Sequence, residues 1–222
     1  MKSAASYEPK IANGVLTFID ALGRAKHVSD PYDYWLLDNI LPQAIIDKIL
    51  ELPIEPMADP VFKGRRENNN GARCHFSAEK QATYPVCREV VSAFGDLQSI
   101  SAIKDLTGAD LSQGQLRVEY CQDRDGFWLE PHLDVGAKLF TMMLYLSKDP
   151  DLYDAGTDIY DSSPMHNLVA SAPYASNAGM IFIPGQHTWH GLSKRPIHGV
   201  RKSLMINFVS QEWRNREELA YQ

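Results

Sequence analysis

A histidine and an aspartate stand two positions apart at His132 and Asp134. On an extended segment both side chains point to the same side, because successive strand residues alternate between the two faces. The pair could therefore bind one metal ion. A second histidine, brought alongside by the fold, would complete a two-histidine, one-carboxylate face whose open coordination positions are typical of non-haem Fe(II) sites.

This spacing occurs often by chance, so alone it is a weak indication of a metal site. The features that follow it in the chain strengthen the interpretation. An apolar strand comes next, then a glycine-containing turn, then a second apolar strand that leads to His187 and His190. The last predicted strand carries Arg201 and Ser203 two positions apart. Either histidine could supply the third metal ligand.

The predicted elements that position these residues are mainly helices before about residue 115 and strands after it. Residues 1–31 are interpreted as an arm or an edge hairpin, and residues 32–38 as a strand. Apolar residues then recur at helical spacing in three segments, residues 41–52, 84–94 and 100–106. After about residue 115, alternating or apolar runs between turn residues predict strands at residues 116–120, 138–147, 157–160, 179–184 and 203–210. No helical spacing interrupts these strands, which favours an antiparallel sandwich or barrel.

We therefore predict a mainly β protein with flanking α-helices, built on a jelly-roll or double-stranded β-helix core. One domain is expected over residues 1–222, with supporting helices and strands in about residues 1–113 and the jelly-roll core in about residues 114–213. Residues 53–77 lack periodicity and include an asparagine–glycine turn cluster at residues 68–71. Such a segment could be a lid, and a solvated surface loop is the alternative.

Composition limits the possible partners and compartments. The net charge of -6 argues against a nucleic-acid partner, because duplex binding usually needs a concentrated basic surface. Three cysteines without paired spacing indicate neither a disulfide framework nor a zinc site. No signal-peptide-like run and no apolar stretch long enough to span a membrane is visible. We expect a soluble cytoplasmic protein without a membrane partner, and its oligomeric state cannot be read from the sequence.

Two strings carry a resemblance to a known family. KLFTMMLYLSKD at residues 138–149 and FIPGQHTWHGL at residues 182–192, with the histidine–aspartate pair before them, resemble the Fe(II)- and 2-oxoglutarate-dependent oxygenase superfamily. The resemblance covers about residues 116–209 and is closest to the prolyl-4-hydroxylase-like branch. It implies that His132, Asp134 and His190 bind Fe(II). It favours His190 over His187, because family members place the ligand directly after the aromatic residue of this motif.

The resemblance also implies a cosubstrate site for 2-oxoglutarate. Arg201 could bind the distal carboxylate through two parallel hydrogen bonds, and Ser203 could donate a third. Tyr120 stands where related enzymes place a tyrosine that bonds the cosubstrate. A surface ion pair for Arg201 and an ordinary strand position for Tyr120 are the alternatives. Asp158 departs from the family, whose members often have a threonine near this position.

The implied reaction is hydroxylation of a C–H bond by O2 and 2-oxoglutarate, with release of succinate and CO2, and ascorbate could serve as the reductant. The expected substrate is a small molecule, polar or anionic. Arg73, Trp128 and Trp189 are its candidate binding residues, although jelly-roll aromatics commonly belong to the core. A peptidyl, prolyl-type hydroxylase is the second possibility. A non-catalytic jelly-roll module that holds a metal for structure is the third.

Overall fold

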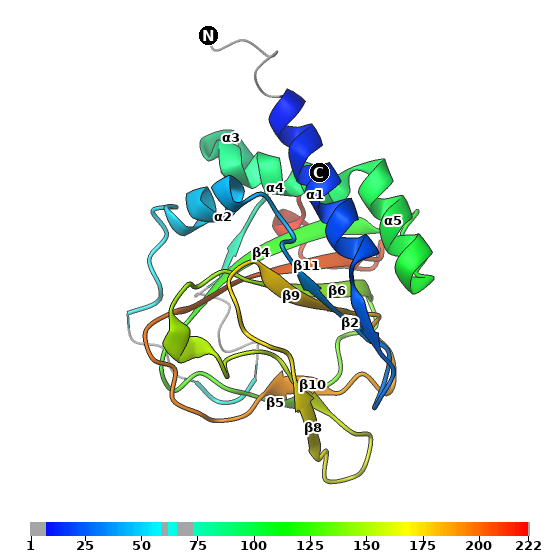
Figure 1. The fold of residues 1–222 in the computed structure, drawn as a ribbon, viewed down its shortest axis with the longest axis vertical. Coiled ribbons are helices and arrows are strands. Elements are labelled where there is room, and N and C mark those ends of the chain that lie inside the picture. Colours follow the sequence, from blue (N-terminus) through cyan, green and yellow to red (C-terminus); the bar gives the residue numbers. More distant parts are fainter. Residues whose placement is uncertain (1–7, 59–61, 66–72, 222) are drawn as a thin grey trace.

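The computed structural model describes residues 8–58, 62–65 and 73–221 of the chain. Two antiparallel sheets face each other, and helices cover the outer side of the larger sheet (Figure 1). The larger sheet has seven strands, in the order β1 (Lys26–Val28), β2 (Tyr34–Asp38), β9 (Ala178–Phe182), β6 (Lys138–Tyr145), β11 (Arg201–Val209), β4 (Gln115–Asp123) and β3 (Arg73–His75). The smaller sheet has four, in the order β5 (Leu129–His132), β10 (His190–Leu192), β7 (Asp158–Tyr160) and β8 (Leu168–Ser171). The predicted jelly-roll core is confirmed.

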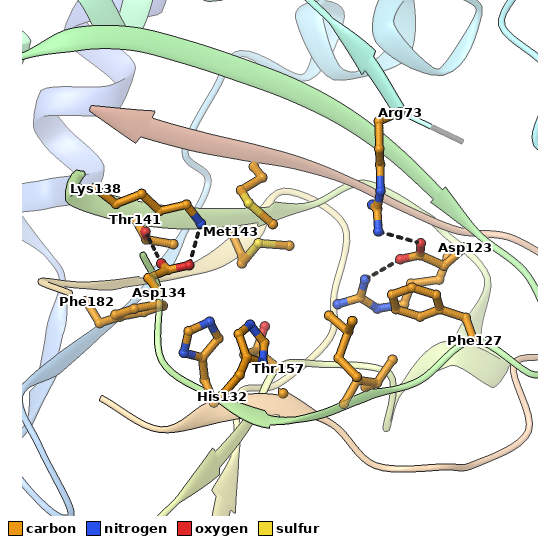
Figure 2. A pocket seen from close by; sticks show the side chains of 16 residues that line it. Arg73, Asp123, Phe127, His132, Asp134, Lys138, Thr141, Met143, Thr157 and Phe182 are labelled. Carbon is orange, nitrogen blue, oxygen red and sulfur yellow. Dashed lines mark hydrogen bonds and ion pairs between the residues drawn. The ribbon is translucent and has the colours of Figure 1, made fainter. Parts of the chain in front are cut away.

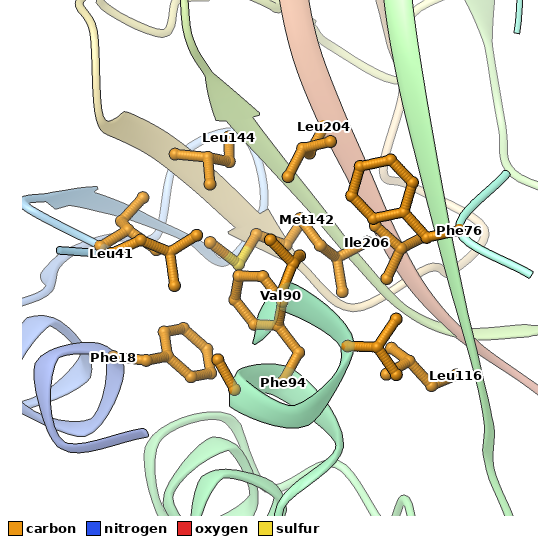
Figure 3. Close-up of a cluster of buried hydrophobic side chains, with 14 of the residues drawn as sticks. Phe18, Leu41, Phe76, Val90, Phe94, Leu116, Met142, Leu144, Leu204 and Ile206 are labelled. Atoms are coloured by element: carbon orange, nitrogen blue, oxygen red, sulfur yellow. The ribbon is translucent and has the colours of Figure 1, made fainter. Parts of the chain in front are cut away.

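The helical layer consists of α1 (Glu8–Gly23), α2 (Gln43–Leu50), α3 (Ala78–Thr83), α4 (Pro85–Gly95) and α5 (Leu97–Thr107). Two short 3₁₀ turns, η3 (Pro150–Leu152) and η4 (Arg216–Glu218), lie in the second half of the chain. The helix face toward the sheet is apolar: Phe18 of α1 meets Phe94 of α4 edge to face, with ring centroids 4.8 Å apart. Figure 3 shows this cluster against Met142 and Leu204 of the larger sheet. None of the described helices combines the length and apolar character needed to cross a bilayer.

The register of β4 and β11 separates the two faces of the larger sheet. Leu116, Val118 and Tyr120 of β4 belong to the helix-side core. The alternate positions, Arg117, Glu119 and Asp123 among them, must therefore face the smaller sheet, because strand residues alternate. On β11, Arg201 pairs with Asp123 and Ser203 with Cys121, so these residues share that second face. One face thus packs on the helices, and the other combines buried polar residues of β4 and β11 with a second hydrophobic cluster that includes Met143 of β6 and Phe182 of β9.

Most predicted elements are confirmed, including the three central helices and the strands after residue 115. The prediction for residues 1–31 is wrong over Glu8–Gly23, which forms helix α1, whereas the expected edge strand is restricted to β1. In α1, Val15, Phe18 and Leu22 form a buried stripe at helical spacing that packs on the other helices. Glycine and β-branched residues give this segment a weak intrinsic preference for helix, and tertiary packing overrides it.

The segment at residues 53–77 also differs from expectation at its end. Arg73–His75 forms strand β3, which pairs with β4 at the edge of the larger sheet. Its earlier part, residues 62–65, lies against β5, where Glu130 donates its N–H to the carbonyl of Gly64 at 2.9 Å. The asparagine–glycine cluster at residues 68–71 lies outside the described residues. The lid remains a prediction.

Candidate metal centre and cosubstrate pocket

The candidate metal ligands meet where β5 pairs with β10. His132 and His190 are direct partners in this pair, and their ring centroids are 4.4 Å apart. Asp134 follows two residues after His132, and one ligand atom from each of the three residues lies within 4.8 Å of the others. The structure therefore brings together the three residues selected from the sequence. Of the rival histidines, His187 is exposed and contacts Ser162 instead.

Backbone carbonyls orient both imidazoles in the same way. Nδ1 of His132 lies 2.9 Å from the carbonyl oxygen of Glu130, and Nδ1 of His190 lies 2.9 Å from that of Thr188. In each case the acceptor belongs to the residue two positions earlier. Donation from Nδ1–H leaves Nε2 with its lone pair, which is the form that binds a metal.

Asp134 is held as a carboxylate by two neighbours on β6. Lys138 forms an ion pair with one of its oxygens, and the hydroxyl of Thr141 donates to the other at 2.6 Å. Burial alone would raise the pKa of Asp134, but the charge of Lys138, together with His190 and the hydrogen bonds, outweighs burial and holds the pKa well below its usual range. The carboxylate is therefore ionised at neutral pH.

His190 completes this electrostatic arrangement. Its burial lowers the pKa of the imidazole to about 4, although Asp134 acts in the opposite direction. The ring is therefore neutral at neutral pH. The neutral imidazole of His190, the imidazole of His132 and the carboxylate of Asp134, with three ligand atoms within reach of one another, fit a divalent Fe(II) ion that keeps open coordination positions.

The metal ligands lie at one end of a pocket between the two sheets, which we call the inter-sheet pocket (Figure 2). Its described lining residues are Arg73, Asp123, Phe127, Leu129, His132, Asp134, Lys138, Thr141, Met143, Thr157, Phe182, His190, Gly191, Leu192, Arg201 and Met205. Figure 2 shows Asp134, Lys138 and Thr141 at one end and Arg73, Asp123 and Phe127 at the other, which we call the distal end. Strands of both sheets contribute to its walls.

Arg201 lies at the distal end and is held in place by two acceptors. Its Nε donates to the carbonyl of Ala155 at 2.6 Å, and its Nη1 donates to Asp123 at 2.8 Å. No described residue accepts a hydrogen bond from its Nη2. Ser203 is fully buried on the same sheet face, and its Oγ has no hydrogen-bond partner among the described residues. Of these two residues, both expected to bind the cosubstrate, Arg201 is among the described lining residues of the inter-sheet pocket and Ser203 is not.

The structure corrects the expectation for Tyr120. Its side chain belongs to the helix-side core with Leu116 and Val118, and it is not among the described residues that line the inter-sheet pocket. Strand parity explains the error, because Tyr120 is an even number of positions from both of these core residues. The alternative interpretation, an ordinary aromatic strand residue, is the one that the structure supports.

The remaining sequence candidates divide between the pocket and its surroundings. Arg73 lines the inter-sheet pocket, whereas neither Trp128 nor Trp189 is among its described lining residues. Trp128 lies beneath the ammonium of Lys194, and Trp189 stacks on His166.

Asp158 stands close to the position where family members often have a threonine, and the residue before it in this chain is Thr157. Thr157 lines the inter-sheet pocket, while Asp158 turns away and accepts hydrogen bonds from Ser171 and Ser193. A threonine does therefore face the pocket in this region.

Sequence reasoning missed Asp123, Lys138 and Thr141 as pocket residues. Lys138 and Thr141 stand inside the string that carried the family resemblance, yet that string was interpreted only as a strand. Asp123 lies beyond the strand predicted at residues 116–120, whereas it is the last residue of β4. Polar residues within an otherwise apolar strand, as at Lys138 and Thr141, were the signal that could have identified the pocket face.

The sequence matches no protein-family model and no curated protein. Solved structures are similar: a prolyl-4-hydroxylase of Pseudomonas putida is 16% identical with a TM-score of 0.55, over 89% of this chain and 99% of that one. A prolyl hydroxylase from Trichoplax adhaerens, in complex with a hypoxia inducible factor oxygen degradation domain peptide fragment, is 10% identical with a TM-score of 0.57, over 96% of each chain. The chain has the fold of these hydroxylases. A viral collagen prolyl hydroxylase from Paramecium Bursaria Chlorella virus-1 shares it at 12% identity and a TM-score of 0.51, over 80% of this chain and 96% of that one.

Proposed function

We propose that this protein is an Fe(II)- and 2-oxoglutarate-dependent dioxygenase that hydroxylates a C–H bond. One observation carries the proposal: His132, Asp134 and His190 bring their ligand atoms within 4.8 Å of one another in a pocket whose far end holds Arg201. An open metal face together with a buried arginine is expected of an enzyme that binds a metal and a carboxylate cosubstrate. A structural metal site would normally be closed by protein ligands.

The residues present fit both the metal and the cosubstrate. His132, Asp134 and His190 would hold Fe(II), and Nη2 of Arg201 and the hydroxyl of Ser203 would donate to the distal carboxylate of 2-oxoglutarate. When bound, Fe(II), 2-oxoglutarate and O2 supply the oxidising chemistry, with succinate and CO2 as products. Apolar lining residues, including Phe182 of β9, exclude water from the reacting C–H bond.

Two substrate classes follow from different observations. A small polar or anionic metabolite is the substrate expected from the sequence, and Arg73 in the pocket lining is its candidate cationic residue. A peptide substrate, as for a prolyl-type hydroxylase, is supported by the solved structures that share the fold, one of which is a complex with a peptide fragment. Trp128 and Trp189, outside the described lining, would contact a substrate only beyond the pocket itself.

Succinate release tests the proposal. The purified protein is supplied with Fe(II), ascorbate and 2-oxoglutarate, and succinate is measured with a metabolite panel and with proline-containing peptides. We expect slow release alone and faster release with members of one panel, which identifies the substrate class. His132→Ala should release none, while His187→Ala, a matched change at an exposed histidine, should behave as wild type. Metal binding without any 2-oxoglutarate binding would contradict the proposal and favour the non-catalytic module.

A further inference from the structure

We infer that Arg73 is a second carboxylate-binding residue at the distal end, beside Arg201, and that it selects cosubstrates that carry a distal carboxylate. The inference rests on the proposed function, because it assigns a ligand group to the same pocket. It changes the role expected for Arg73 from binding the primary substrate to binding the cosubstrate.

Two guanidinium groups converge on one carboxylate at the distal end. Arg201 donates from Nη1 to Oδ2 of Asp123 at 2.8 Å, and Nη2 of Arg73 lies 3.4 Å from Oδ1 of the same residue. The side chains of Arg73 and Arg201 are 5% exposed and that of Asp123 is 3% exposed. We call these three residues the distal cluster. The two guanidinium groups exceed the one carboxylate within this cluster, and Glu119 beside Arg73 belongs to a wider network that offsets the excess.

Glu119 and Glu218 balance the charges around the distal cluster. Glu119 lies 3.5 Å from Nε of Arg73, but its other oxygen is 2.5 Å from Arg117, and Arg117 also pairs with Glu218 at 2.5 Å. The three arginines and three carboxylates of this network balance. A dianionic oxoacid that binds together with a divalent metal ion would leave the charge of the pocket unchanged.

One donor atom of Arg73 lacks an acceptor, although its side chain also hydrogen-bonds Cys121. Its Nε is buried and has no hydrogen-bond partner among the described residues. Its ion-pair distances of 3.4 and 3.5 Å are longer than the roughly 2.7–2.9 Å of a good charge-assisted hydrogen bond. A buried donor without an acceptor is costly, so such groups often mark the place of a ligand. A carboxylate beside Asp123 would supply the missing acceptor oxygens.

Arg73 is also held in position before any ligand arrives. The backbone of Arg73 pairs with that of Cys121 across β3 and β4. Its guanidinium lies over the ring of Phe127, 5.6 Å from the ring centroid. Figure 2 shows Arg73 and Phe127 on the side of the pocket away from Asp134. Arg73 is therefore placed at the end where a metal-chelating oxoacid would direct its distal carboxylate, and away from the metal, where the reacting C–H bond of the substrate must lie.

Calorimetric titration of the protein loaded with Mn(II) tests the inference without turnover. The ligands are 2-oxoglutarate and 2-oxobutyrate, which keeps the chelating oxoacid and lacks the distal carboxylate. We expect Arg73→Met to weaken 2-oxoglutarate binding by roughly 10- to 100-fold, the loss of a charge-assisted hydrogen bond, and to leave 2-oxobutyrate binding unchanged. Arg24→Met, a matched change at an exposed arginine, should affect neither ligand.

Each outcome separates the inference from the proposed function. If Arg73→Met binds 2-oxoglutarate as tightly as wild type while Arg201→Met does not, the inference is overturned and the proposed function stands. If wild type binds no 2-oxoglutarate, the proposed function fails and the inference fails with it. Should thermal melting show that Arg73→Met is unfolded, Arg73→Lys replaces it, because lysine keeps the charge and loses the planar fork. A smaller loss, restricted to 2-oxoglutarate, is then expected, and an unchanged preference between the two oxoacids would overturn the inference.

Discussion

His132 and His190 are direct partners across the β5–β10 pair, with ring centroids 4.4 Å apart. Each imidazole also contacts the carbonyl two residues before it, at 2.9 Å from Nδ1. The backbone of two neighbouring strands therefore fixes the separation and the tautomer of both rings. The two imidazoles are already arranged before a metal ion binds, so the entropic cost of ordering them on binding would be small.

Removing one ring of this pair should remove metal binding. We expect His190→Ala to weaken Mn(II) or Co(II) affinity by at least about 100-fold, since loss of outer-shell partners alone typically costs 10- to 100-fold. Calorimetry or the visible absorption of bound Co(II) measures the change. His187→Ala is the matched control, and an equal loss in both variants would show that His190 has no special role.

The hydroxyl of Thr141 should tune metal affinity through Asp134. Thr141→Val keeps the side-chain shape but removes the 2.6 Å hydrogen bond to the carboxylate. We expect about tenfold weaker Mn(II) binding and a loss of about 1–3 kcal/mol of unfolding free energy, because the buried amide of Asn207 also donates to this hydroxyl at 2.9 Å. Thr17→Val, which removes a hydroxyl that bonds within helix α1, is the control. Equal metal affinity in wild type and Thr141→Val would contradict this role.

Gly191 permits the close approach of β10 and β5. A Cβ at this position would lie 2.7 Å from the carbonyl oxygen of Leu129 and 3.0 Å from that of Glu130, both of which are backbone atoms. We therefore expect Gly191→Ala to displace β5 together with His132. The variant should lose about 1–3 kcal/mol of unfolding free energy and bind metal more weakly.

Gly23→Ala provides the matched comparison for this change. A Cβ at Gly23 meets nothing within 4 Å, so its effect on stability should be small and its metal affinity unchanged. Urea unfolding and Mn(II) titration of both variants make the comparison. Wild-type metal affinity in Gly191→Ala would show that β5 tolerates the displacement.

The metal face could be predicted from sequence because its determinants are local. His132 and Asp134 share a strand face by spacing alone, and His190 stands inside a recognisable string. Arg73 could be proposed only as a cation in a segment without periodicity. Its strand, β3, has three residues, too few to show alternation, and only its pairing with β4 brings Arg73 to the pocket.

For Tyr120, by contrast, the local alternation of residues was sufficient to predict its face of the sheet, and the analogy with related enzymes led to the wrong face. Leu116, Val118 and Tyr120 alternate with Arg117 and Glu119, so parity alone assigns Tyr120 to the apolar face. Analogy with related enzymes placed it in the pocket instead. The alternation of polar and apolar residues along β4 was the more reliable guide, because it follows from the geometry of the strand itself.

Asp158 should support stability in a pH-dependent way. Burial by itself raises its pKa, but hydrogen bonds from Ser171, Ser193 and Arg195 outweigh burial and lower it. Ionised Asp158 therefore stabilises the fold above its unfolded-state pKa of about 3.9, and this contribution is lost as the pH falls through that value toward the lower folded-state pKa.

The variant Asp158→Asn tests this expectation. Because it removes the charge of the fully buried Asp158 from its hydrogen bonds and its ion pair with the partly exposed Arg195, we expect a loss of about 1–3 kcal/mol at pH 7, with a smaller difference from wild type below about pH 4. Urea unfolding across this pH range measures both quantities. Asp33→Asn, at an exposed aspartate, should differ little from wild type at either pH. A difference that stays constant with pH would exclude the proposed ionisation effect.

Strand β3 has a consequence for how this protein can be dissected. A fragment that starts at β4 would retain His132, Asp134, His190 and Arg201 and would still contain every motif recognised in the sequence. It would lack Arg73, and it would expose the apolar side of the larger sheet that the helices cover. Recombination at the start of β4 would therefore transfer the recognised motifs without the proposed selectivity for a distal carboxylate. That selectivity depends on Arg73, which is encoded in the first half of the chain.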